Sequence, residues 1–407
     1  MQSRLRKTVI SMLLLLFLPM LLSGCWERRE LNELAFVLAL GLDKAEAGYK
    51  VTMQVVIPSS MASQTSGGAG GSGVPVISYS FPVATVYESL RKFNLTSSRS
   101  SYLGHIRVLV IGEALAREGV ADTLDVLKRS REPRMDFYVM VARNNTAENV
   151  LNVLTPLDKL PASKLFNALD KSYKVSAKTV AVTLDKFIED LLYKGKDPIL
   201  TGIEIQGDAQ KGGEKSNTER TSPNARLRYE SVAVFKKDKM IGWLDDTEAI
   251  GCNYINNNVT KNTGIVKGED GKWIVIEALT TTTRRKVKFI DGEPHIFLEV
   301  KAISNVEEIQ GTDRLDTEKI VRKLEEKAEA RIIGRMEQAI EQVNKRYNVD
   351  IFGFGQSIYR ANPKAWARLQ ERKGDDYLKT LPVHITADVT INRVGTIDNS
   401  FIDQIEE

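Results

Sequence analysis

Cysteine and histidine are both scarce in this chain. Its 407 residues include two cysteines, Cys25 and Cys252, and three histidines, His105, His295 and His384, which lie far apart in the sequence. A structural zinc site needs four cysteine or histidine ligands, usually in short, regular spacings. The sequence therefore predicts no metal centre, and stability must come from hydrophobic cores.

Motifs of the common enzyme classes are also missing. There is no H-E-x-x-H motif and no P-loop, and residues 70–74 miss the G-x-S-x-G pattern because Val74 replaces the last glycine. Residues 68–73 match G-x-G-x-x-G, but no helical pattern follows them, so no nucleotide site is expected. The acidic pairs at 245–246 and 375–376 are predicted to be solvated near turns. We expect a non-catalytic protein without a cofactor.

A strong excess of one charge sign is absent. Arg4, Arg6 and Lys7 are three of the 57 basic residues, and they lie in an N-terminal segment that we expect to be removed. The remaining chain then carries 54 basic against 53 acidic residues. This balance argues against a nucleic-acid partner, because such binding usually relies on a net positive field.

The longest apolar run is too short for a permanent membrane span. Val9–Leu22 is apolar apart from Ser11, and it carries Pro19. At ~1.5 Å per residue, a helix over this run would be about 21 Å long, below the ~30 Å hydrocarbon core of a bilayer. Basic residues precede the run, which is the order found in a secretory signal peptide.

The run ends in the sequence LSGC at 22–25, the pattern of a lipoprotein signal. A thiol is needed to take a diacylglycerol group, and small residues before it let the chain lie extended in the processing peptidase. We predict that residues 1–24 are a signal peptide and that Cys25 becomes the lipidated N-terminus, with acyl chains such as palmitate holding the chain on the outer face of a membrane. Cys252 is then left without a disulfide partner, and we expect it to be a small buried hydrophobic side chain.

Residues 25–205 alternate between strand and helix patterns. Strands are predicted at 35–42, 49–57, 105–111, 136–142 and 199–205, and helices at 83–94, 113–118, 120–130, 145–154 and 183–194. Ser59–Gly73 is rich in glycine and serine and predicts a flexible loop. This alternation is typical of an α/β region, expected here to contain two modules.

The second half has a different pattern. Residues 206–224 have no large apolar side chain and are predicted to be an interdomain linker or a long disordered loop. Within the C-terminal domain, 225–407, a mostly antiparallel meander is predicted from strands at 229–235, 240–244, 273–282, 285–290, 295–306 and 382–393. Residues 317–346 place apolar side chains three or four apart, which predicts a long helix packed on the meander. The expected fold class is α/β and α+β, with several domains.

Five blocks of sequence resemble one protein family. They are GCWERRELNEL at 24–34, GHIRVLVIGEALAREG at 104–119, DVLKRSREPR at 125–134, AVFKKDKMIGWL at 233–244 and DIFGFG at 350–355. In this order they resemble the Ger(x)C family, the lipoprotein C subunits of the receptors through which spores sense nutrient germinants. The resemblance covers essentially the whole mature chain, although the glycine-rich stretch 59–73 does not map onto the family pattern.

The resemblance implies a location and partners. Such subunits are expected on the outer face of the spore inner membrane, beside two integral membrane subunits, in a complex that triggers germination in response to nutrients. Three α/β modules are implied, the last a curved sheet with helices. The alternative is a solute-binding lipoprotein of a transporter. That class needs two similar lobes with parallel sheets, whereas the two halves of this chain differ.

Overall fold

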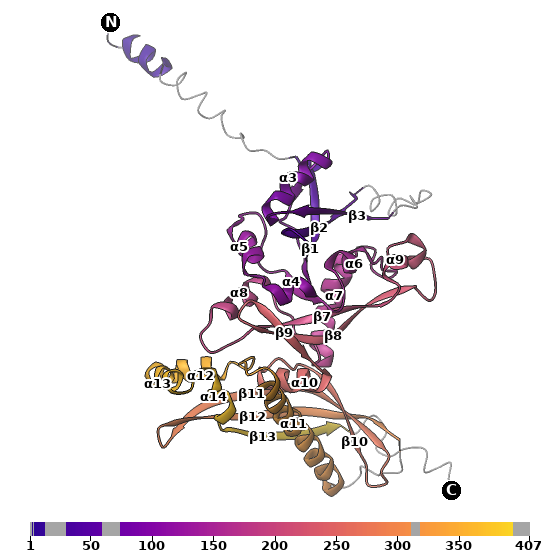
Figure 1. Cartoon of the computed structure of the whole chain (residues 1–407), viewed down its shortest axis with the longest axis vertical. Coiled ribbons are helices and arrows are strands. Elements are labelled where there is room, and N and C mark those ends of the chain that lie inside the picture. The colour runs from indigo at the N-terminus through magenta and orange to yellow at the C-terminus, as the bar shows by residue number, and fades with distance from the viewer. Residues whose placement is uncertain (1, 3, 13–29, 59–73, 311–317, 394–407) are drawn as a thin grey trace.

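The molecule is elongated and contains two β-sheets arranged along its long axis (Figure 1). The computed structural model describes residues 2, 4–12, 30–58, 74–310 and 318–393. The predicted lipid site, Cys25, and the predicted loop at 59–73 lie outside these ranges. Within them, no helix is both long and apolar enough to cross a membrane.

The first sheet is parallel in its centre and antiparallel at both edges. Its order is β3-β2-β1-β5-β6-β7-β8-β9, and β4 pairs with β1 outside this path. Strands β1, β5, β6 and β7 run parallel, while β2–β3 and β8–β9 form antiparallel edges. The strands are β1 (Leu34–Lys44), β2 (Tyr49–Val56), β3 (Val76–Val83), β4 (Ser100–Tyr102), β5 (Val108–Gly112), β6 (Tyr138–Ala142), β7 (Ile199–Gly207), β8 (Ala225–Lys236) and β9 (Lys239–Leu244).

Helices cover both faces of this sheet, which confirms the α/β part of the predicted fold class. They are α3 (Val86–Thr96), α4 (Glu113–Glu118), α5 (Ala121–Arg129), α6 (Ala147–Asn152), α7 (Pro161–Ser176) and α8 (Leu184–Leu192). Helices α3, α4, α5 and α8 contribute to the hydrophobic core on one face, whereas α6 and α7 contribute to the core on the other. A short 3-10 turn, η1 (Leu31–Glu33), precedes β1.

The stretch predicted as a linker, 206–224, is folded. It contains the end of β7, helix α9 (Ala209–Gly212) and the turn η2 (Lys215–Thr218). The fully buried side chain of Asn217 donates to the carbonyls of Leu154 (2.8 Å) and Ala225 (3.1 Å) and accepts from the Ala225 N–H (3.0 Å). The expectation of a disordered loop was wrong because buried hydrogen bonds, which leave no apolar pattern, hold this stretch in place. The role of this stretch as a linker between domains stays a prediction.

The hairpin predicted at 229–244 exists, but it belongs to the first sheet and not to the C-terminal meander. Strand β8 pairs antiparallel with β7, and β9 continues the same sheet. The central residues of β8 are buried on both faces: Ala233 and Phe235 lie in the core of the first sheet, and Val232 and Val234 lie in the core of the second. A hairpin pattern fixes the pairing of its own strands, but it does not specify the sheet they join.

The second sheet has the order β10-β11-β12-β13. Strands β10 (Asn262–Lys267), β11 (Trp273–Ile290) and β12 (Glu293–Ile309) are antiparallel, and β13 (Val383–Arg393) runs parallel to β12. The strands predicted at 273–282 and 285–290 are one long strand, whose pairing with β12 has register shifts after Val275 and after Ala278. The predicted long helix is α11 (Glu318–Arg346), which contacts β10 and β13 and so packs on this sheet as expected.

Smaller helices complete the second half. They are α10 (Asp246–Ile255), α12 (Phe354–Ala361), α13 (Pro363–Lys373), η3 (Gly374–Asp376) and α14 (Tyr377–Thr380). Helix α10 is buried on nearly all sides between β8–β9 and α11. One hydrophobic core therefore joins residues of the first sheet, such as Leu244, to α10, α11 and the second sheet.

Glycine lets α10 approach α11 closely. A Cβ atom at Gly251 would lie 2.2 Å from the carbonyl oxygen of Arg335 and 2.7 Å from the Cβ of Ala339. A real Cβ atom would force the two helices apart. The shared core thus depends on a missing side chain at this position.

We expect Gly251→Ala to destabilise the protein by about 1–3 kcal/mol, the usual cost of overpacking a core. Gly334→Ala is the matched control, because Gly334 is exposed on α11 with no atom within 4 Å of its would-be Cβ. This control should be neutral or more stable by about 0.5–1 kcal/mol, since alanine is the better helix former. Denaturant unfolding measures both, and equal stability of the Gly251 variant and wild type would contradict the close approach.

Candidate functional site at the junction of the two sheets

Two loops meet between the two halves of the molecule. One joins α8 to β7 and contains Asp197, and the other joins α11 to α12 and contains Asp350. The Asp197 N–H donates to the Asp350 carbonyl (2.8 Å), and the Asp350 N–H donates to the Asp197 carboxylate (2.9 Å). The Gln356 N–H donates to the carbonyl of Gly195 (2.8 Å). These hydrogen bonds tie the first half directly to the second, and we call this contact the joint.

The buried carboxylate of Asp350 organises the second loop. It accepts hydrogen bonds from the Phe354 N–H (3.0 Å), the Gly355 N–H (2.6 Å) and the Tyr377 hydroxyl (2.6 Å). The first N–H groups of a helix have no partner inside the helix, so a carboxylate there satisfies them and favours helix formation. Burial raises the pKa of Asp350 above its ordinary value, although these hydrogen bonds oppose the shift, and burial also raises the pKa of Asp197.

Glycines allow the two loops to come together. Gly195 has a φ of +72°, and a Cβ atom there would lie 2.6 Å from the carbonyl carbon of Gly355. A Cβ atom at Gly355 would lie 2.5 Å from both the Trp366 ring and the Tyr377 hydroxyl. A side chain at Gly195 would separate the loops, and a side chain at Gly355 would displace Trp366 and Tyr377, which pack behind the second loop.

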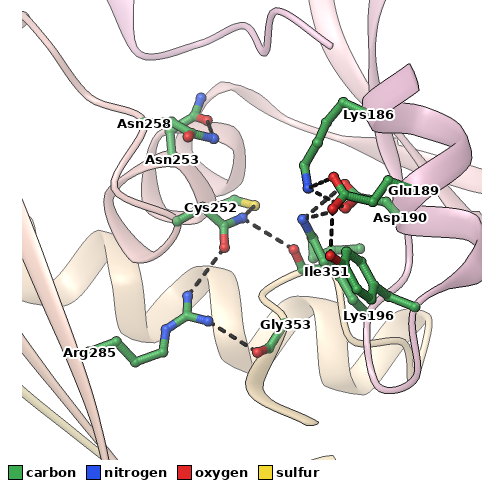
Figure 2. A network of polar contacts seen from close by, with 12 residues as sticks. Lys186, Glu189, Asp190, Lys196, Cys252, Asn253, Asn258, Arg285, Ile351 and Gly353 are labelled. Atoms are coloured by element: carbon green, nitrogen blue, oxygen red, sulfur yellow. Dashed lines mark hydrogen bonds and ion pairs between the residues drawn. The ribbon is translucent and has the colours of Figure 1, made fainter. Parts of the chain in front are cut away.

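Arg285 extends the joint into the second sheet, as Figure 2 shows. From β11, its guanidinium donates to the Gly353 carbonyl (3.1 Å) and the Ser357 hydroxyl (3.2 Å) near α12. It also donates to the Ile255 carbonyl (2.9 Å) and the Asn256 side-chain oxygen (3.3 Å) at the end of α10. One largely buried cation thus links β11, α10 and α12.

A cavity of ≈ 430 Å³ lies beside the joint. The charged residues that line it are Lys186, Asp190, Lys196, Arg285 and Arg360. The buried Asp190 pairs with Lys186 (3.0 Å) and Lys196 (2.9 Å), and Arg360 lies over the ring of Tyr193 at 5.7 Å. The protein's own groups therefore hold these cations. Both lysines that line this cavity are paired with Asp190, an arrangement typical of a structural contact between domains.

Cys252 is buried on α10, with 1% of its surface exposed. Burial raises the pKa of its thiol to about 12, so the nucleophilic thiolate is not formed near neutral pH. The expectation of a small buried hydrophobic side chain is confirmed.

Two of the three histidines come together in space. His295 on β12 and His384 on β13 place Nδ1 and Nε2 3.1 Å apart. His105, predicted in a strand, lies in a turn before β5. Among the residues that the structure describes, no group of three or more histidine, cysteine, aspartate or glutamate side chains could hold a metal ion.

The acidic pairs have structural partners. Asp245 caps α10 by accepting from the Glu248 N–H (2.8 Å), and Asp246 pairs with Lys178. Asp375 pairs with Lys236 at 2.9 Å, an ion pair that also spans the two halves of the chain.

Comparison with known proteins covers both halves. Residues 27–205 match the family model described as "Spore germination protein N-terminal domain", and residues 230–395 match the one described as "Spore germination B3/GerAC like, C-terminal". The chain belongs to the Ger(x)C family of spore germination proteins.

Relatives of this Ger(x)C protein span its full length. Spore germination protein KC of Bacillus subtilis (strain 168) is 29% identical over 99% of both chains. Spore germination protein B3 of the same organism is 23% identical over 89% of this chain and 92% of that one. The crystal structure of the GerBC protein shares the fold with a TM-score of 0.52 at 17% identity, covering 86% of this chain and 96% of that one.

The sequence of this Ger(x)C protein points to one of the two loops of the joint. The DIFGFG block at 350–355 was singled out by resemblance, and the structure explains its aspartate and its second glycine by packing. Asp197, Arg285 and Tyr377 were missed. Gly195 follows a predicted helix, and a glycine there indicates a turn. Nothing in the sequence, however, indicates that this turn contacts residues 350–356.

Tyr377→Phe tests the joint. We expect a loss of about 1–3 kcal/mol of stability, because the Asp350 carboxylate loses a buried hydrogen-bond donor. The hydroxyl lowers the pKa of Asp350, so its removal raises that pKa further in the folded state only. A raised carboxyl pKa contributes stability at low pH that is lost as the pH rises through the folded value. The loss of stability in the Tyr377→Phe variant, relative to wild type, should therefore be smallest below about pH 4 and larger at neutral pH.

The control for this variant is Tyr359→Phe, whose side chain is exposed on α12. Urea unfolding of both variants at several pH values is the measurement. A Tyr377 variant that matches the control at every pH would show that the hydroxyl contributes nothing to the joint.

Proposed function

We propose that this Ger(x)C protein is a lipid-anchored, non-catalytic subunit of a nutrient germinant receptor. Cys25 carries the lipid, and the body lies on the outer face of the cell membrane, which in spores is the inner membrane. Two integral membrane subunits are its partners in nutrient-triggered germination. The observation that carries the proposal is the match over the full length to spore germination proteins.

The joint supports a mechanical role for the body. Hydrogen bonds, glycine contacts and one shared core hold the two sheets together, so a lipid at one end would set the position of both. In this proposal the protein offers its membrane partners a rigid surface at a fixed height. The alternative, a solute-binding lipoprotein, has less support, because the first sheet is mixed and broad while the second has four strands.

Spores carrying Cys25→Ala should germinate poorly in nutrients, because the protein is no longer held at the membrane. Wild-type protein should carry a diacylglycerol group on Cys25 by mass spectrometry. Cys252→Ala is the matched control, since it removes the other thiol and leaves the anchor intact. Normal nutrient germination of Cys25→Ala spores, or wild-type protein without lipid, would overturn the proposal.

A further inference from the structure

Helix α3 leaves an amphiphilic face uncovered. Val86, Ser89 and Phe93 point inward and are buried. On the opposite side, Tyr87, Arg91 and Leu95 are spaced four residues apart, so they lie in one row along the helix. Tyr87 is 55% exposed and Leu95 is 88% exposed, and the Arg91 guanidinium lies over the Tyr87 ring at 6.0 Å.

A further exposed leucine lies at the same end of the molecule. Leu31 is 74% exposed in η1, directly before β1. Strands β1 and β4 are parallel, with Leu34 opposite Ser100, so η1 lies beside the start of β4. The Ser101 N–H donates to the side chain of Asn94 (3.4 Å). Asn94 directly precedes Leu95 on α3. Leu31 and the end of α3 therefore both lie beside the short strand β4, at the end of the folded body where Figure 1 places α3.

This end lies next to the predicted anchor. Cys25 precedes Leu31 by only a few residues in the sequence. A fully extended residue spans at most ~3.6 Å, so lipid on Cys25 would keep Leu31 within about 22 Å of the bilayer. Tethering at so short a distance makes even a weak contact effective, because the local concentration of the surface is high.

We propose that Leu31, Tyr87, Arg91 and Leu95 form a lipid-facing surface that rests in the interface of the bilayer. Leucines bury in the outer acyl region, tyrosine is favoured at the level of the headgroups, and arginine extends its charge to lipid phosphate while its stem stays in apolar surroundings. The acidic Glu33 in η1 offsets part of the basic charge, so the contact depends on apolar insertion more than on anionic lipid. This inference rests on the proposed lipidation, and it adds an orientation: the long axis stands up from the membrane with α3 at its base.

The test uses the full lipidated chain in phosphatidylcholine vesicles with bromine on the acyl chains. A polarity-sensitive fluorophore is attached at Leu95→Cys, or at Leu157→Cys as the control, which is 96% exposed in the loop between α6 and α7. Labelling is selective because lipid blocks the Cys25 thiol and Cys252 is buried. We expect blue-shifted, bromine-quenched emission at position 95 and water-like emission at position 157.

The possible results distinguish the lipid anchor on Cys25 from the lipid-facing surface. Water-like emission at both positions on vesicle-bound protein would overturn the lipid-facing surface and leave the anchor standing. Protein that does not bind vesicles at all would overturn the anchor and the inference together. A photocrosslinker at position 95 in spore membranes that captures protein in place of lipid would assign this face to a membrane subunit and would also overturn the inference.

Discussion

The reciprocal pairing of Asp197 and Asp350 is the contact on which the arrangement of the two halves depends. Each residue donates its backbone N–H to the other, and the Asp350 carboxylate also holds the first turn of α12 and the Tyr377 hydroxyl. A backbone N–H buried without a partner costs free energy similar to that of a lost hydrogen bond. Opening the joint therefore exposes several groups at once, and separating the halves is unfavourable.

Packing reinforces this polar contact. Strand β8 contributes alternate side chains to the cores of both sheets, and α10 is buried between β8–β9 and α11. A contact between independent domains is usually polar and limited in area, which permits relative motion. Here the core is continuous, and the Lys236–Asp375 ion pair bridges the same boundary, while Arg285 holds α10 and α12 to β11 within the second half. These contacts predict that the body moves as one unit, which the proposed role as a spacer requires.

The sequence reveals most of the local elements and little of this boundary. Apolar periodicity located β1, β2, α4 and α11 within a few residues, because each follows a simple repeat. Helix α7 was missed, although Pro161 stands at its first turn, and the strong burial of α10 leaves no amphipathic pattern to detect. Asn217 and Arg285 act through hydrogen bonds to distant backbone groups, and such partners cannot be read from spacing. The LSGC sequence at 22–25 is a local motif, and the lipidation that it predicts at Cys25 stays a prediction.

Native-state hydrogen exchange tests the central claim that the two sheets form one unit. The amides of Asp197, Asp350 and Gln356 all donate across the joint, and the amide of Val234 in β8 provides an internal reference. Amides that exchange only when the whole protein unfolds report the global free energy of unfolding and its dependence on denaturant. We expect the joint amides to exchange together with this reference amide. The opposite result is that the joint amides exchange through a local opening of lower free energy that does not depend on denaturant, while β8 and β12 stay protected. This result would show that the two halves separate on their own, and it would contradict the claim that they form one unit.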